Sequence, residues 1–410
     1  MNSSNLIRVP YASAVFGKEE IAAVNKVLAN PQRIVAGESV REFEKKIARL
    51  FGKRYGVMVN SGSSANLIAL EVLNLPPGSE VITPILTFST TLAPILQKGL
   101  VPVFADVVEG AYIINVDQVE SLITKKTKAM MIPSLLGNIP DLERLSKLAR
   151  RHKLWLIEDS CDTLGPRYKG KPTGFYSHIS TTSFYASHII TAAGGGGMVC
   201  FHDSKLARRA LVMSNWGRQS TLFGLHEKSE DLKKRFAGRI DGGVYDAKFI
   251  FSEVGYNFQP TELSGAFGLE QLKRLKQFFA ARRRNFSSLE KFFKKYEHFF
   301  ILPRQSNKQA EVNWLAFPLT IRPGAPFTRL QISKFLEERN IQTRPIFTGN
   351  VLRQPAFNKI KAKRTLPSGY PVADQVMCNG IVLGCHQGLT IKQKTYLLAT
   401  LELFLKKYII

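Results

Sequence analysis

The chain has 410 residues, of which 44% are hydrophobic and 22% are charged, a balance typical of a globular protein with about two domains. No apolar run approaches the roughly 18 residues of a membrane helix, and the N-terminal stretch lacks the basic start and apolar segment of a signal peptide, so we expect a cytoplasmic protein without membrane insertion. The formal net charge of +25 leaves binding to nucleic acid open.

Short apolar runs alternate with helical patterns from residue 57 onward. Strands are predicted at 57–59, 81–83, 101–107, 129–133 and 154–157, and helices from about residues 63 and 89 and over 142–152. This alternation predicts an α/β fold with a mainly parallel sheet that helices cover on both faces. Each point where a strand ends and a helix begins is a place where a site can form.

Composition divides the chain into two predicted domains. Residues 1–275 are expected to form the large domain, and residues 276–410 a smaller α+β domain, with the first 25 or so residues packed on the small domain. The connection 217–255 is rich in Gly, Lys and Asp and shows little periodicity. A long connection of this kind is more often functional than structural, so we predict a functional loop.

Much of the positive charge falls between residues 273 and 295, where Arg282 is one of nine basic residues on an amphipathic helical pattern. We interpret this stretch as the solvated face of a helix that joins the domains, with a bound anion as the alternative. The chain shows no zinc-finger spacing and no RNA-binding aromatic signature.

Three motifs carry polar residues that could perform chemistry. NSGSSAN at 60–66 follows a strand and opens a helix, which suits a bound phosphate, although an ordinary helix cap looks similar. LWLIEDS at 154–160 contains Asp159, whose carboxylate could keep a pyridine nitrogen protonated; a capping aspartate is an equally good interpretation. His188 precedes four glycines at 194–197, and a lone histidine is more often structural than catalytic.

Together these motifs resemble the sugar aminotransferases of the DegT/StrS type, which belong to the aspartate-aminotransferase superfamily and share the architecture called fold type I. The resemblance extends from Pro10 into the C-terminal domain. It rests on SGSSANL at 61–67, TPILTFSTT at 83–91, EDSCDTLG at 158–165, SFYASH at 183–188, GYNFQPTELSGAFGLEQL at 255–272 and RPIFTGN at 344–350.

The resemblance implies a site for pyridoxal or pyridoxamine phosphate. Asp159 is expected to pair with the pyridine nitrogen, Phe88 to stack on the ring, and Asp162 to lie near the ring oxygen. Asn257 is expected to reach the phosphate of the neighbouring subunit, which implies a homodimer with shared active sites. The positions expected around the phosphate are Gly62, Ser63, Ser64 and Ser183.

One residue departs from the family pattern. The usual motif Ser-Phe-x-x-x-Lys places the cofactor-binding lysine where this chain has His188, and no lysine lies between Lys171 and Lys205. An imidazole cannot link covalently to pyridoxal phosphate, but it moves protons near neutral pH. We therefore expect a cofactor held without a covalent link, most usefully as pyridoxamine phosphate, with His188 as the catalytic base.

A histidine at this position resembles the nucleotide-sugar 3-dehydratases. One type uses GDP-4-keto-6-deoxymannose and no metal, and SFYASHIIT and RPIFTGN resemble it. The other uses CDP-4-keto-6-deoxyglucose, an iron–sulfur cluster and a reductase, and LWLIEDSCD, VLRQPAF and QGLT resemble it. Cys161 matches one cluster position, but no cysteine lies between Cys200 and Cys378. A cluster of this kind needs four thiolates, so we predict no metal.

The predicted function is C3 dehydration of a nucleotide-diphosphate 4-keto-6-deoxyhexose, with glutamate regenerating the amine, for lipopolysaccharide or another surface glycan. Weaker candidates for substrate contacts are Tyr185, Arg218, Arg344 and His386. Two alternatives stay open. One is a sugar aminotransferase that uses another lysine. The other is a non-catalytic relative that binds nucleic acid or regulates, against which the complete set of cofactor motifs argues.

Overall fold

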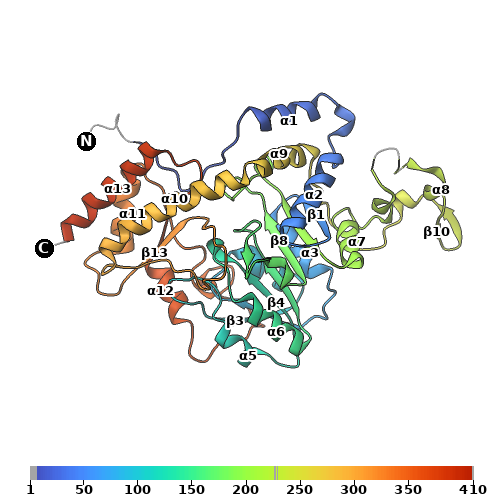
Figure 1. Cartoon of the computed structure of the whole chain (residues 1–410). Helices are drawn as coiled ribbons and strands as arrows, with labels where there is room; N and C mark the ends of the chain where they lie inside the picture. The colour runs from blue at the N-terminus through green and yellow to red at the C-terminus, as the bar shows by residue number, and fades with distance from the viewer. Residues whose placement is uncertain (1–6, 226–227, 229, 409–410) are drawn as a thin grey trace.

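The computed structural model describes residues 7–225, 228 and 230–408, and its two largest sheets lie at either end of a long helix (Figure 1). The larger sheet has seven strands in the order β1-β9-β8-β5-β4-β2-β3. Its strands are β1 (Tyr55–Val59), β2 (Glu80–Pro84), β3 (Val101–Ala105), β4 (Thr127–Pro133), β5 (Trp155–Asp159), β8 (Ile179–Ser183) and β9 (Gly197–Phe201). The strands predicted from the sequence correspond to β1 through β5.

The prediction of a mainly parallel sheet is confirmed, since every pairing among β2, β3, β4, β5 and β8 is parallel. Strand β9 was not predicted, and it runs antiparallel to both of its neighbours. A parallel return normally needs a helical crossover. The segment between β8 and β9 instead carries turns, His188 and the first three of the four glycines, so the chain folds back antiparallel.

Helices cover both faces of the large sheet. Ile157 of β5 packs with α3 and α4, whereas its neighbour Leu156 packs with α6 on the other face. Because side chains alternate along a strand, Glu158 and Asp159 at the end of β5 face opposite sides. The helices concerned are α3 (Gly62–Glu71), α4 (Ser89–Gln97) and α6 (Leu142–His152).

A second, antiparallel sheet lies in the C-terminal part of the chain, with the strand order β12-β13-β15-β14. Its strands are β12 (Phe300–Ile301), β13 (Phe317–Ile321), β14 (Thr343–Arg344) and β15 (Gly380–Leu383), and its helices are α11 (Arg329–Glu337), α12 (Pro371–Asn379) and α13 (Ile391–Leu405). An aromatic-rich core fills the space between the sheet, α11 and α13.

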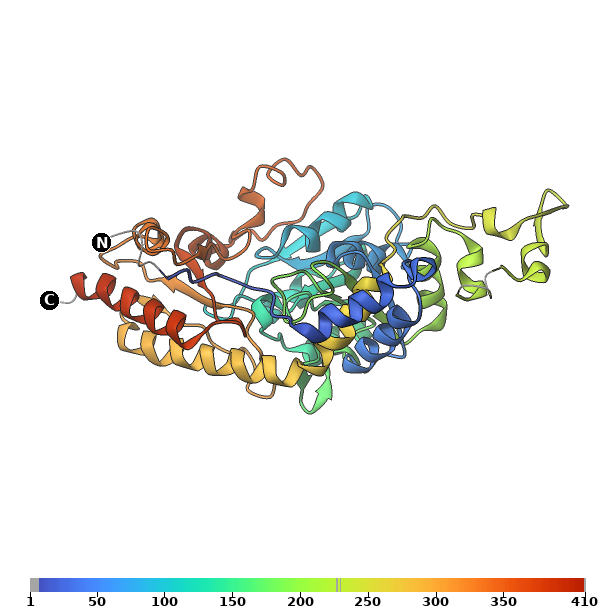
Figure 2. The same ribbon diagram turned by 90° about the horizontal axis from the view of Figure 1, so that it is seen from above.

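Helix α10 (Leu275–Phe293) runs from the large sheet to the small one (Figure 2). Its outer side is basic and exposed, as predicted, at Arg283 and Arg284. The prediction was wrong for Arg282, which is 1% exposed. This arginine lies on the inner side of α10 and contacts the backbone of Trp314 and Leu315.

The N-terminal segment contacts both parts of the structure. Val9 pairs with Ile341 beside the small sheet, and the backbone N–H of Tyr11 donates to the side chain of Gln342 at 3.1 Å. Helix α1 (Lys18–Leu28) packs instead along α9 (Glu262–Lys273). The first residues described therefore lie on the small sheet, and the helix that follows lies with the large one.

The described residues of 217–255, called the arm below, project from the large sheet (Figures 1 and 2). The arm contains α8 (Leu232–Arg235) and a hairpin of β10 (Gly238–Ile240) and β11 (Gly243–Tyr245). Its exposed apolar side chains are Leu232, Phe236, Ile240, Val244, Tyr245, Phe249, Phe251 and Val254. Across the part of the chain that the structure describes, no helix combines the length and apolar character needed to cross a membrane.

Candidate active site

Most of the predicted site residues lie where parallel strands end. Gly62, Ser63 and Ser64 begin α3 after β1, and Phe88 precedes α4 after β2. Asp159 closes β5 and Asp162 follows it, while Ser183 closes β8 and His188 follows it. This carboxyl edge is where open α/β sheets place their ligands.

Asp159 is 4% exposed and held by three hydrogen bonds. Its Oδ2 accepts from Asn66 Nδ2 at 2.8 Å and from Thr91 Oγ1 at 2.7 Å, and its Oδ1 accepts from the N–H of Cys161 at 3.1 Å. Thr181 Oγ1 donates to Asn66 Oδ1 at 2.6 Å, which fixes the orientation of that amide. Asn66 and Thr91 lie within motifs of the sequence, but nothing there indicated that they bond to Asp159.

The beginning of α3 lies against the end of β8. A Cβ atom at Gly62 would stand 2.5 Å from Ser183 Cβ and 2.9 Å from Ser183 Oγ, so only glycine permits this approach. Helices leave their first N–H groups without an intrahelical partner, which suits a phosphate, and Ser63 is exposed there. Ser64 instead turns inward, and its Oγ donates to Asn60 Oδ1 at 2.7 Å.

His188 lies in the turn after β8, with its Nδ1 3.4 Å from the carbonyl oxygen of Ser183. A carbonyl only accepts, so this bond places the proton on Nδ1 and leaves a lone pair on Nε2. The pKa of His188 is lowered to about 4, mainly by burial; the Ser183 carbonyl and Asp159 oppose this shift, and Arg282 adds to it. The imidazole is therefore neutral near pH 7 and can accept a proton.

Asp162 is 8% exposed, and its Oδ2 accepts from the N–H of Leu136 at 2.8 Å. Burial, with the neighbouring charge of Asp159, raises the pKa of Asp162 to about 7. Two carboxylates close together in a dry site cannot both ionise easily. Asp162 therefore holds a proton up to about pH 7.

A pocket of about 600 Å³ lies beside these residues and is lined largely by rings and apolar side chains. Phe88, which is 50% exposed, meets Phe347 edge to face at 5.9 Å between ring centres. Arg344 also lines the pocket, with its guanidinium 5.9 Å from the ring of Tyr11. Tyr11 was not singled out in the sequence, because no local pattern around it predicts a pocket.

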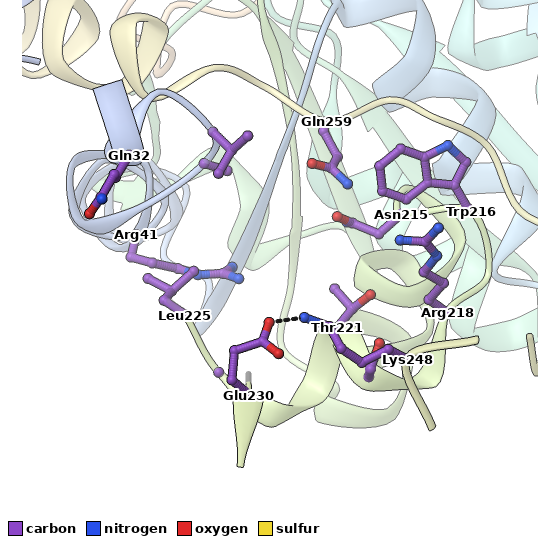
Figure 3. Close-up of a pocket in the computed structure, with 14 residues that line it drawn as sticks. Gln32, Arg41, Asn215, Trp216, Arg218, Thr221, Leu225, Glu230, Lys248 and Gln259 are labelled. Atoms are coloured by element: carbon purple, nitrogen blue, oxygen red, sulfur yellow. Dashed lines mark hydrogen bonds and ion pairs between the residues drawn. The ribbon is translucent and has the colours of Figure 1, made fainter. Parts of the chain in front are cut away.

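A second pocket, of about 480 Å³, lies between the base of the arm and the α2 region (Figure 3). Arg218 stands here within 4.6 Å of the Trp216 ring and 5.4 Å of the Phe249 ring, and its Nε is buried without a partner among the described residues. Arg41 enters the same pocket from α2 (Glu38–Leu50). Arg218 therefore lies in a pocket different from the one that Phe88 and Arg344 line.

The three remaining candidates have distinct surroundings. Asn257 is exposed and pairs through its backbone with Asn215. Tyr185 is 60% exposed, with its ring 6.1 Å from that of His188. His386 is 1% exposed, and its Nε2 lies 3.2 Å from the carbonyl oxygen of Pro10. His386 thus contacts the N-terminal segment and not either pocket.

The aminotransferase alternative requires a lysine beside Asp159. Lys53 is 4% exposed, and its Nζ donates to the carbonyl oxygens of Ser177 at 2.6 Å and His178 at 3.2 Å. The hydroxyl of Ser177 donates to Glu158, so Lys53 lies on the Glu158 side of the sheet, opposite Asp159. Among the described residues that line the pocket of Phe88, none is a lysine.

The cysteines are dispersed. Cys200 and Cys385 are buried, Cys161 is half-buried and Cys378 is exposed, and none is in a disulfide. Within the described ranges, no group of three or more His, Cys, Asp or Glu side chains is arranged to hold a metal ion.

Known proteins share both the sequence and the fold. The chain is 38% identical to dTDP-4-dehydro-2,6-dideoxy-D-glucose 3-dehydratase of Saccharopolyspora spinosa, over 92% of this chain and 82% of that protein. It is 32% identical to GDP-4-keto-6-deoxy-D-mannose 3-dehydratase of Yersinia pseudotuberculosis, over 93% and 95% of the two chains. Escherichia coli GDP-4-keto-6-deoxy-D-mannose-3-dehydratase with bound hydrated PLP superimposes with a TM-score of 0.84 at 29% identity, over 97% of this chain and 100% of that one.

These likenesses confirm the predicted fold type I architecture. A model of the DegT/DnrJ/EryC1/StrS aminotransferase family also matches residues 15–402, which is nearly the whole chain. The chain therefore belongs to the DegT/DnrJ/EryC1/StrS aminotransferase family.

Proposed function

We propose that this chain is a pyridoxamine phosphate-dependent dehydratase that removes the C3 hydroxyl of a nucleotide-diphosphate 4-keto-6-deoxyhexose. The observation that carries the proposal is the neutral imidazole of His188 beside Asp159, in a site where the family pattern expects a lysine. Relatives at 38%, 32% and 31% identity are named as sugar 3-dehydratases, and these names support dehydration over transamination.

The described residues fit the cofactor. Asp159, fixed by three hydrogen bonds, would hold a protonated pyridine nitrogen, and the beginning of α3, which lies against Ser183, would take the phosphate. Exposed Phe88 would cover the ring. When bound, pyridoxamine phosphate supplies an amine that condenses with the C4 ketone and a ring that takes up electrons.

The protein's part is orientation and proton transfer. Nε2 of His188 accepts a proton, because Nδ1 is committed to the Ser183 carbonyl. The imidazolium so formed then gives this proton to the C3 hydroxyl, which leaves as water. Burial favours this return, since it makes a charged imidazole a strong acid. We propose glutamate as the donor that regenerates the amine.

The aromatic pocket is proposed to take the nucleotide-sugar. Its walls are apolar, and Arg344 supplies a cation that would pair with a phosphate group. Tyr185 is exposed beside His188 and is positioned to contact the sugar. We do not assign a substrate contact to His386, because it is buried against Pro10.

We also propose that the enzyme is a homodimer with shared sites. The arm carries exposed rings and, at its base, Arg218, and the exposed Asn257 follows two residues after the arm ends. Neither residue lines the pocket of Phe88 in its own chain. A partner's arm that docks over that pocket would bury the rings and add both polar groups to the site.

The test of the reaction is mass spectrometry of products from a panel of GDP-, CDP- and dTDP-4-keto-6-deoxyhexoses, incubated with pyridoxamine phosphate and glutamate. Dehydration predicts a sugar that has lost the C3 oxygen and keeps its ketone. A product that carries nitrogen at C4 and keeps the C3 oxygen would establish an aminotransferase instead. Stoichiometric binding of random DNA, with no sugar converted, would favour the non-catalytic alternative.

A further inference from the structure

Arg282 is a buried cation without a carboxylate partner. It is 1% exposed on the inner side of α10. Of the ion pairs found among the described residues, none includes its guanidinium, and its Nε is also without a hydrogen-bond partner there. Burying an unpaired charge is costly. Stability alone therefore does not account for an arginine at this position.

The guanidinium bridges two segments of the candidate site. Its Nη2 reaches the carbonyl oxygen of His188 at 3.4 Å, and its Nη1 donates to the carbonyl oxygen of Leu315 at 2.7 Å. Leu315 donates from its N–H to Leu136 at 2.8 Å, and Leu136 donates to Asp162 Oδ2 at 2.8 Å. A continuous path of hydrogen bonds thus connects the turn of His188 with Asp162.

Helix α10 makes a second hydrogen bond near the site, from Asn285. Asn285, three residues further along α10, donates from Nδ2 to the carbonyl oxygen of His386 at 2.9 Å. Gln387 in turn donates to the carbonyl oxygen of Ile189, next to His188, at 3.2 Å. The turn that carries the imidazole is therefore hydrogen-bonded to α10 directly, through Arg282, and indirectly, through the loop of His386 and Gln387.

We infer that Arg282 is a positioning residue for the dehydration, which fixes the turn of His188 against Asp162 and keeps a positive charge beside the imidazole. The inference rests on the proposed function, in which His188 is the base. Arg282 need not touch the substrate, and it acts through the backbone it holds and through its charge.

The charge favours the neutral imidazole. The groups that face His188 are Arg282 from α10, Asp159 from β5, the carbonyl of Ser183 from β8 and the ring of Tyr185 from the same turn. Arg282 opposes a charge on the ring, and burial lowers the pKa of Arg282 itself only to about 10, so it stays positive at neutral pH. Removing it leaves Asp159 as the nearby charge, and the pKa of His188 then rises.

The experiment compares Arg282→Met, which removes the charge, with Arg282→Lys, which keeps the charge but lacks the planar fork that bridges Leu315 and His188. Arg283→Met, one residue along and exposed, is the matched control. The imidazole of His188 is titrated by NMR in the cofactor-free protein, and the pH profile of dehydration is measured in the holoenzyme. The titration needs no turnover, so it tests Arg282 even if no sugar of the panel is dehydrated.

For Arg282→Met we expect the His188 midpoint and the acid limb of kcat/KM to rise by about one pH unit. For Arg282→Lys we expect an unchanged midpoint with a rate loss of about 10- to 100-fold, since small misplacements of a catalytic group are costly. Wild-type rates in Arg282→Lys, or a wild-type midpoint in folded Arg282→Met, overturn the inference. If Arg282→Met does not fold, Arg282→Gln replaces it in the same titration, with the same two outcomes.

Discussion

The site around His188 and the arm are constructed in opposite ways. At the strand ends, polar groups such as Asp159 and Asp162 are buried and hydrogen-bonded within the chain. On the arm, rings such as Phe251 are exposed, and Arg218 is surrounded by aromatic groups with no carboxylate paired to it among the described residues. In the first region, the buried polar groups find their hydrogen-bond partners within one chain. The second region presents exposed rings, and a cation that has no ion-pair partner in the described part of its own chain.

The largest effect is expected at His188. His188→Asn keeps the shape of the turn but removes the base, so the dehydration rate should fall by about 10²–10⁴-fold while pyridoxamine phosphate still binds. Single-turnover rates and cofactor titration measure the two properties separately. A rate within about threefold of wild type, far inside the range for loss of a base, would make His188 a structural residue.

Hybrid dimers test whether Asn257, just after the arm, completes the site of a neighbouring chain. Asn257→Ala and His188→Asn chains should each be nearly inactive alone. Random mixing makes half of the dimers hybrid, and one of the two sites in each hybrid carries neither change, so about a quarter of wild-type activity should return. Verified heterodimers without recovered activity would show that each chain builds its site alone.

Arg218 should matter for binding more than for chemistry. Arg218→Met is expected to weaken the affinity for the nucleotide-sugar about tenfold, because one charge-assisted contact is lost. Calorimetry with the nucleoside diphosphate measures this directly. Arg239→Met is the control on the same arm, since Arg239 is exposed and bonds only to nearby arm carbonyls in the structure. Equal losses in both variants would point to general electrostatics.

A smaller effect is expected on stability at Asp162. The folded-state pKa of about 7 lies above the ordinary value of about 3.9. The folded protein therefore binds more protons between these values, and stability falls as pH rises from about 4 to 7. Asp162→Asn should raise Tm at pH 8 by about 1–2 °C, the response of a chain of this length to roughly 1 kcal/mol, and leave it unchanged at pH 4. An equal Tm at pH 8 would contradict the shifted pKa.

No effect is expected when the protein is offered iron and sulfide. The arm contains no cysteine, so anaerobic incubation with iron and sulfide should leave no bound cluster. Iron analysis and the visible spectrum provide the measurement. About two irons per chain with a cluster spectrum would show that the arm, or a second chain, supplies ligands that this sequence does not suggest.

The features that could be predicted from the sequence are those that depend on a few adjacent residues. Strand ends, the beginning of α3 and the positions of Asp159 and His188 follow from short motifs, because each depends on a few adjacent residues. Arg282 was misassigned to a solvated face, since its inner position depends on packing against Leu315, 33 residues further along. Tyr11 was missed because the pocket wall it forms depends on contacts with Gln342, 331 residues away.

The pairing of Val9 beside the small sheet also affects the aromatic pocket. Val9 donates to Asn340 and accepts from Gln342, both at 2.9 Å, and two residues later Tyr11 lines the aromatic pocket. The segment from Val9 to Tyr11 is thus part of the wall of the aromatic pocket. A change that pulls this segment away from the small sheet is therefore expected to reshape that wall, even though the change lies outside every motif of the site.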